Sequence, residues 1–156
     1  MSYQIRTATP NDFEAILALI KELAAFENAS EQVINTVEQM KAEQELFSCF
    51  VVEQEDGTII GMALYYLVYY TWVGKSLYLD DLYIQEAYRG QGIGSALLGE
   101  LFKVAKQENC KRVRWQVLDW NEPAIHFYKK IGATIDGEWC NCDFDTAGIA
   151  NFGENF

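Results

Sequence analysis

The sequence predicts an α/β fold, with a mixed, mostly antiparallel sheet flanked by helices in the order β-α-α-β-β-β-α-β-α-β. In the first half, strand-like apolar runs are joined by a short turn signal, which is typical of antiparallel hairpins. In the second half, strand-like runs alternate with helix-period patterns, which indicates β-α-β crossovers. The chain has 156 residues, and we interpret residues 1–156 as a single domain that is long enough to bury a core.

The first elements are one strand and two helices. Residues 3–8 alternate like a strand. The segment Thr9-Pro10-Asn11-Asp12 then supplies an N-cap, a proline and an acid, and apolar residues recur at helical spacing between Phe13 and Ala24. These signals predict an amphipathic helix. The capping-box pattern Thr36-Val37-Glu38-Gln39 indicates a short second helix.

Three strands follow in succession. Residues 47–54 and 58–70 are apolar runs on either side of Glu55-Asp56-Gly57, which is a hairpin turn signal. Residues 71–75 are expected to turn the chain into a third strand over 76–84.

The second half predicts a helix over 94–108, a strand over 111–119 and a helix over 123–131. Pro123 stands at the start of this last helix, and Gly132 ends it in the manner of a C-cap. For the tail, residues 134–156, we expect one further strand and a loose end.

A glycine-rich segment, Arg89-Gly90-Gln91-Gly92-Ile93-Gly94, lies between a predicted strand and a predicted helix. Bare amide N–H groups at such a helix start form a site for a phosphate group. A P-loop would need Gly-Lys-Ser/Thr, and no lysine follows Gly94. The dinucleotide fingerprint Gly-x-Gly-x-x-Gly also fails by one position, because Ser95 stands where its third glycine should be. In that fold, moreover, the glycine loop follows the first strand, whereas here several predicted strands precede it.

Two motifs in this order resemble the GNAT family of N-acetyltransferases. Arg-x-x-Gly-x-Gly at 89–94 resembles the family's acyl-CoA loop. Asn121, Ala124 and Tyr128, which share one face of a helix, match the family pattern Asn-x-x-Ala-x-x-x-Tyr-x-x-x-Gly. The resemblance implies a GNAT-type form of the predicted fold.

From Ile5 to about Trp139 the chain resembles one group of that family, the diamine acetyltransferases that act on spermidine, spermine or thialysine. The matching segments are Leu19-Ile20-Lys21-Glu22-Leu23-Ala24, Glu31-Gln32-Val33, Tyr78-Leu79-Asp80-Asp81, Tyr88-Arg89-Gly90 and Trp120-Asn121-Glu122-Pro123.

The resemblance implies acetyl-CoA as co-substrate. Tyr128 would be the general acid that protonates the leaving sulfur, and Asp80, where the family commonly has Glu, would take the amine proton through a water molecule. The implied cofactor-binding residues are Leu82, Tyr83, Ile84, Arg89, Gly90, Gln91, Gly92, Ile93, Gly94, Ser95, Asn121 and Tyr128.

The implied substrate is a small primary amine with a second positive charge: a polyamine, a diamine or a thialysine-like amino acid. Its expected binding residues are Glu27, Trp72, Asp80, Asp81 and Trp139. Capping of loop amides is the alternative role for Asp81, and ordinary burial is the alternative for the two tryptophans.

A net charge of −11 and a pI near 4.4 argue against a nucleic-acid partner and are compatible with a cationic small molecule. Two alternatives to a diamine acetyltransferase remain open: a GNAT enzyme acting on another amine, such as a protein N-terminus or an aminoglycoside, and a non-catalytic acyl-CoA-binding module. The resemblance also implies a homodimer.

The four cysteines do not form a zinc-ligand spacing with the single histidine, His126, and we interpret them as reduced structural thiols. The first residues lack the layout of a signal peptide. No apolar run approaches the ~18 residues needed to span a membrane. We therefore expect a cytoplasmic protein without a metal site or membrane contact.

Overall fold

The computed structural model describes residues 2–153. The chain divides into two compact units, Met1–Gln116 and Val117–Phe156. The prediction that 1–156 is a single domain stays a prediction.

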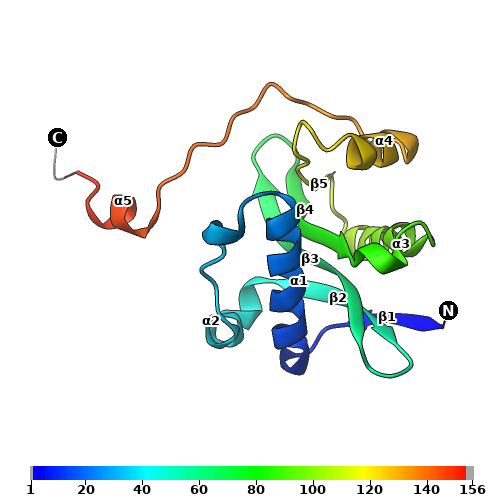
Figure 1. Cartoon of the computed structure of the whole chain (residues 1–156). Coiled ribbons are helices and arrows are strands. Elements are labelled where there is room, and N and C mark those ends of the chain that lie inside the picture. Colours follow the sequence, from blue (N-terminus) through cyan, green and yellow to red (C-terminus); the bar gives the residue numbers. More distant parts are fainter. Residues whose placement is uncertain (1, 154–156) are drawn as a thin grey trace. The chain divides into compact units, whose positions relative to one another are not determined.

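The first unit is built on a five-stranded sheet in the order β1-β2-β3-β4-β5 (Figure 1). The first four strands pair antiparallel, and β5 pairs parallel to β4. The mixed α/β class predicted from the sequence is therefore confirmed. The strands are β1 (Tyr3–Thr7), β2 (Ser48–Gln54), β3 (Ile59–Tyr70), β4 (Gly74–Ile84) and β5 (Val113–Arg114).

Helix α1 (Phe13–Phe26) lies across the sheet (Figure 1). Its apolar stripe packs with α2 (Val37–Ala42) onto one face of β2, β3 and β4. Helix α3 (Ile93–Gln107) contacts β3 and β4 with a separate stripe. Short 3-10 turns span Pro10–Asp12, Ser30–Gln32, Gln44–Leu46 and Glu86–Tyr88. The buried core of the α1 face consists of Phe13, Ile16, Leu17, Leu19, Met40, Cys49, Val51, Met62, Leu64 and Tyr83.

The start of α1 is fixed by Asp12, as the sequence indicates. Its carboxylate accepts from the Thr9 amide at 2.7 Å and from two guanidinium nitrogens of Arg6 at 2.8 Å each. The Arg6 hydrogen bonds are the main cause that lowers the pKa of Asp12 to about 2. One carboxylate thus ties β1 to the first helix.

Two strand boundaries differ from the sequence predictions. Strand β4 begins at Gly74, inside the predicted 71–75 turn, because Gly74 adopts a φ of 91° that makes the turn tight. Strand β5 is much shorter than the predicted 111–119, because it pairs with β4 only at Leu77 and Tyr78.

The second unit contains α4 (Glu122–Lys130) and α5 (Thr146–Ala150). Asn121 caps α4, accepting from the Ala124 amide at 3.4 Å. Beyond α4, Gly132 adopts a φ of 95°, as expected of a residue that ends a helix.

The further strand expected in the tail does not form within residues 134–153, so that prediction is wrong for the described part of the tail. A strand needs a neighbouring strand for its backbone groups, and none pairs with this segment among the described residues. Instead, Asp145 accepts from the Gly148 amide at 2.8 Å and begins the short helix α5. The rings of Phe144 and Phe152 pack edge to face across it, 5.7 Å apart. The last residues of the predicted tail, 154–156, lie outside the described residues.

Candidate functional site

A β-bulge in β4 brings two carboxylates to the same face of the sheet. Across the β3–β4 ladder, Leu64 pairs with Asp81 and the next residue, Tyr65, pairs with Leu79, so Asp80 has no partner in the register. In a regular strand, consecutive side chains point to opposite faces. The extra residue resets this alternation, and Asp80 and Asp81 therefore both face the side covered by α1.

Both carboxylates line a pocket of about 300 Å³ on that face. Its walls come from α1, α2, the segment before β2, and the middle of β3 and β4. Most of the wall is apolar, and the carboxylates give it one acidic region. The lining residues are Ile20, Asn35, Met40, Leu46, Phe47, Leu64, Tyr66, Asp80 and Asp81.

The electrostatics of this pocket favour a cation. Burial is the main cause that raises the pKa of Asp81 to about 7, and the charges of Asp80 and Glu27 raise it further. Burial also raises the pKa of Glu27, which ends α1 where the helix carbonyls add partial negative charge. No basic side chain is among the lining residues. Asp80 and Asp81 are thus brought together in this pocket, and Glu27 lies near enough for its charge to raise the pKa of Asp81, although it is not among the lining residues.

Tyr66 is a site residue that the sequence analysis missed. Its hydroxyl donates to Asp80 Oδ1 at 3.2 Å, and its ring stacks on that of Tyr78 with centroids 5.5 Å apart. It stands in an aromatic-rich run that reads as an ordinary strand core. The adjacent acids, Asp80 and Asp81, interrupt the apolar alternation and are the one sequence signal of the bulge.

The glycine loop is open and its backbone is exposed. Gly90 and Gly92 have φ angles of 76° and 80°, which favour glycine. Gly92 is the N-cap of α3, and no side chain caps this helix start among the described residues. The first amides of α3 have no acceptor within the helix. A Cβ placed on Gly90, Gly92 or Gly94 would meet no atom within 4 Å, so space is open where a ligand would approach.

The side chain of Arg89 braces this loop. Its Nε donates to the Ile84 carbonyl at 2.9 Å. Its guanidinium lies 5.7 Å from the Phe26 ring centroid and 5.4 Å from that of Tyr83. The arginine therefore links the end of β4 and the end of α1 to the start of the loop.

The predicted pantetheine-binding residues, Leu82, Tyr83 and Ile84, form the last part of β4. On one side they pair with β3. On the other side, the β4–β5 ladder includes only Leu77 and Tyr78. This end of β4 therefore lacks a β-ladder on that side within residues 2–153.

The predicted residues of the second unit lie on or beside α4. Asn121 acts as its N-cap, and Tyr128 lies in the same helix, half-buried, with its ring 5.6 Å from that of Phe127. The helix confirms that Asn121, Ala124 and Tyr128 can share one face.

Neither tryptophan is buried, so the alternative of ordinary burial is wrong for both. Trp72 lies in the β3–β4 turn with 81% of its surface exposed. Asp81 lies well along the strand from that turn, roughly 20 Å at about 3.3 Å per residue. The structure therefore does not bring Trp72 to the acid pair within one chain. Trp139 is 74% exposed, and its Nε1 donates to Asp136 Oδ2 at 3.0 Å.

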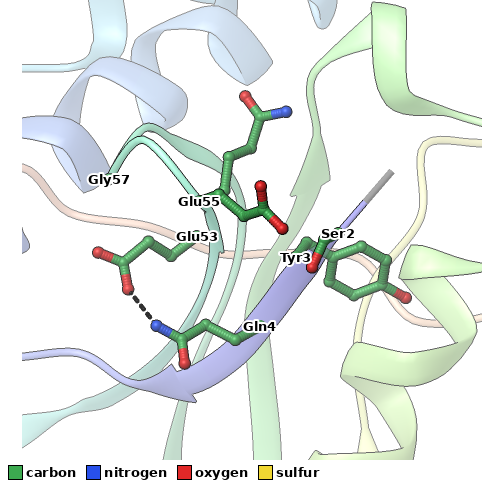
Figure 2. Close-up of a pocket in the computed structure, with 7 residues that line it drawn as sticks. Ser2, Tyr3, Gln4, Glu53, Glu55 and Gly57 are labelled. Carbon is green, nitrogen blue, oxygen red and sulfur yellow. Dashed lines mark hydrogen bonds between the residues drawn. The ribbon is translucent and has the colours of Figure 1, made fainter.

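A second cavity, of about 310 Å³, lies at the β1 edge of the sheet and holds none of the predicted site residues (Figure 2). Gln4 and Glu53, which face it, hydrogen bond to each other at 2.7 Å (Figure 2). The lining residues are Ser2, Tyr3, Gln4, Glu53, Gln54, Glu55 and Gly57. The cavity is unconnected with the chemistry suggested by the sequence.

Within residues 2–153, no group of three or more His, Cys, Asp or Glu side chains is placed to hold a metal ion. No helix in this part of the chain is long and apolar enough to cross a bilayer.

Comparison with known proteins identifies the family. The model of the acetyltransferase (GNAT) family matches residues 14–133. The chain is 38% identical over 143 residues to mouse (Mus musculus) thialysine N-epsilon-acetyltransferase, covering 85% of this chain and 84% of that protein. It is also 38% identical over 141 residues to human (Homo sapiens) spermidine/spermine N(1)-acetyltransferase-like protein 1, covering 84% of this chain and 20% of that protein.

One similar solved structure is an aminoglycoside acetyltransferase from an uncultured soil metagenomic sample. It has a TM-score of 0.76 at 20% identity and covers 93% of this chain and 100% of that one. At this identity the likeness concerns the fold. Together with the family match and the mouse relative, these findings show that the chain is an N-acetyltransferase of the GNAT family, in the group of the diamine acetyltransferases.

Proposed function

We propose that the protein transfers an acetyl group from acetyl-CoA to a primary amine of a small polycationic substrate: a polyamine, a diamine or a thialysine-like amino acid. The observation that carries this proposal is the bulge that turns Asp80 and Asp81 into one pocket. The apolar wall of that pocket suits an aliphatic chain, and its carboxylates suit the ammonium groups that the chain connects.

The residues of the glycine loop fit the pyrophosphate of coenzyme A. The first amides of α3 and the helix dipole favour an anion, and the open space over Gly90, Gly92 and Gly94 allows close approach. The backbone of Leu82, Tyr83 and Ile84 would hold the pantetheine arm along the edge of β4. Bound acetyl-CoA supplies an activated thioester carbonyl.

In the proposed mechanism, Asp80 accepts the proton of the substrate ammonium through a water molecule. The amine nitrogen would then form the new bond to the acetyl carbon as the carbon–sulfur bond breaks, and it would release its second proton to solvent, from which the Tyr128 phenol regains a proton after each turnover. Tyr128 donates its proton to the departing sulfur, which is possible because a tyrosine phenol is ordinarily protonated at neutral pH.

The acidic pocket opposes one step of this mechanism. Nearby negative charge stabilises an ammonium ion and so raises the pKa of the amine. A second ammonium group bound near Asp81 and Glu27 offsets part of that charge. For this reason we expect two-charge substrates to react faster than substrates with one charge.

Of two further proposals, only the first rests on the relationship to the diamine acetyltransferases. We expect a homodimer, and we expect the protein to act in the cytoplasm. Trp139, which is exposed, remains a proposed contact of the amine. Trp72 is not proposed, because within one chain it lies far along the strand from the acid pair.

The test compares putrescine with n-pentylamine, a monoamine with the same number of heavy atoms, in an acetyl-CoA assay. The assay is run at pH 8, above the pKa of about 7 of Asp81, so that this carboxylate is ionised. A second cation held by a carboxylate is worth about 1.5–3 kcal/mol. The wild type should therefore prefer the diamine in kcat/KM by roughly ten- to a hundredfold.

Asp81→Asn should reduce that preference, and Glu55→Gln serves as the matched control. Glu55 lines the cavity at the β1 edge, so its loss changes net charge by the same amount without touching the acid pair. Equal kcat/KM for the two amines in the wild type would refute the proposed substrate class. A preference that survives Asp81→Asn unchanged would assign the second cation to Glu27 instead.

A further inference from the structure

The hydroxyl of Tyr66 is placed at the acid pair by its own strand pairing. Tyr66 of β3 lies directly across from Tyr78 of β4. The two rings stack with an interplanar angle of 29°. The Tyr66 ring also packs against the buried cluster under α1. Strand pairing, stacking and packing thus restrict the ring to one orientation.

Asp80 depends on that hydroxyl for its own orientation. Its side chain is exposed, and as the unpaired residue of the bulge it has no cross-strand neighbour to hold it. The Tyr66 hydroxyl donates to Oδ1 at 3.2 Å. This bond leaves the second oxygen, Oδ2, for the amine or for a bridging water molecule.

The charges around the pair add to the importance of this contact. The charges of Asp80 and Glu27 raise the pKa of Asp81. The charge of Asp81 in turn contributes to the raised pKa values of Cys49 and Tyr78. Burial raises the pKa of Tyr66, and the charge of Asp80 raises it further, so its hydroxyl remains a donor across the working pH range. The Tyr66 hydroxyl is therefore a neutral hydrogen-bond donor to Asp80 in a region where the neighbouring groups are acidic.

We propose that Tyr66 is a positioning residue that orients the Asp80 carboxylate for proton removal from the substrate amine. The inference rests on the proposed function and deepens it. Tyr66 acts through Asp80, and its ring alone would fill the wall of the pocket equally well. Tyr66→Phe separates the two roles, because it removes the hydroxyl and keeps the ring.

The experiment is a double-mutant cycle with Tyr66→Phe, Asp80→Ala and the combined variant. Tyr69→Phe is the matched control, because Tyr69 lies on the same strand and is 77% exposed. The values of kcat and KM are measured with acetyl-CoA and with spermidine or thialysine as the amine. Circular dichroism and urea midpoints check that each variant is folded.

We expect Tyr66→Phe to lower kcat by about tenfold or more, the loss that follows removal of a hydrogen bond to a charged group. The KM for the amine should change much less, because the carboxylate and its charge remain. In the Asp80→Ala background, Tyr66→Phe should have no additional effect, because residues that act through one another are not additive. Tyr69→Phe should match the wild type.

A Tyr66→Phe variant with wild-type kcat would overturn the inference, as would a full additional loss in the Asp80→Ala background. In both cases the wild type is active and the proposed function stands. A wild type that acetylates neither amine would instead refute the proposed function, and the role of Tyr66 with it.

Discussion

The two carboxylates of the bulge differ in environment although they are neighbours in sequence. Asp80 is exposed and accepts from Tyr66, whereas Asp81 is half-buried with a pKa raised to about 7. A carboxyl group whose pKa rises on folding is better accommodated when it is protonated. Asp81 therefore costs the fold stability as the pH rises above its ordinary pKa of 3.8, and the full cost is reached above the folded pKa of about 7.

Asp81→Asn should consequently stabilise the protein at high pH. The ordinary pKa is 3.8 and the folded value is about 7. Below pH 3.8 the group is protonated in both states and the substitution should have little effect. Between pH 3.8 and about 7 the unfolded wild type has released the proton that the folded state still holds, and above about 7 the difference between the two states no longer grows. The advantage of Asn should grow accordingly, by about 1.4 kcal/mol per pKa unit at most.

Urea unfolding of the wild type and Asp81→Asn at pH 4 and pH 8 measures this difference. Glu55→Gln, which alters an exposed carboxylate, is the control. A variant that is equally stable relative to wild type at both pH values would show that Asp81 is not perturbed by folding.

Tyr128 is the residue on which the proposed chemistry depends most. Tyr128→Phe should lower turnover by about 10²–10⁴-fold, the range for loss of a general acid, while the affinity for coenzyme A changes little. The measurement is kcat under conditions where the chemical step limits the rate, together with calorimetry of the cofactor. Wild-type turnover in this variant would reduce Tyr128 to a packing role beside Phe127.

Among the elements, the start of α3 offers the sharpest test of cofactor binding. Gly92 is a poor choice for substitution, because its φ of 80° would strain any other residue. Gly94 lies within the first turn of α3, and a Cβ there would meet no atom within 4 Å. Gly94→Ala should therefore leave the fold intact or stabilise the helix by up to about 1 kcal/mol.

The same Cβ lies where the pyrophosphate would approach the first amides of α3. We expect Gly94→Ala to weaken binding of coenzyme A by about tenfold, or about 1.4 kcal/mol. Gly99→Ala, in the same helix and equally open, should raise helix stability without that loss. Calorimetry that finds equal affinities for the two variants would exclude the loop as the pyrophosphate site.

The elements also show where sequence reasoning succeeds. Local signals such as the carboxylate of Asp12 and the cap at Asn121 predict helix starts that the structure confirms. Pairing over longer distances is harder to predict. The bulge at Asp80, the partnership with Tyr66 and the short β5 all depend on which residue of a neighbouring strand lies opposite, which no local pattern specifies.

At the scale of the whole molecule, the tail is the part whose structure was predicted least well from the sequence. Its apolar residues suggest a strand, but the choice between strand and helix depends on a partner. In the described residues the cap at Asp145 and the pairing of Phe144 with Phe152 lead to a helix instead. By contrast, the glycine loop followed by the Asn121–Tyr128 pattern identified the family correctly, because two motifs in a fixed order are more specific than either motif alone.

The expected homodimer is tested by light scattering at micromolar concentration. We expect a particle of about twice the chain mass, on the relationship to the diamine acetyltransferases. The tail exposes Trp139, Phe144, Ile149 and Phe152, and such side chains are commonly covered in an assembly. A particle of 17.8 kDa would contradict the expectation.

The bulge has a consequence for how the fold would respond to a deletion. Without Asp80, Leu79 and Asp81 would become direct neighbours opposite Tyr65 and Leu64, and the β3–β4 ladder would continue without interruption. Every other side chain of β4 would keep its face. The hydrophobic pattern thus has no need of this residue, and the shortened chain should fold at least as well while losing the proposed proton acceptor. In this strand, the residue proposed for catalysis is therefore not one of the residues on which folding depends.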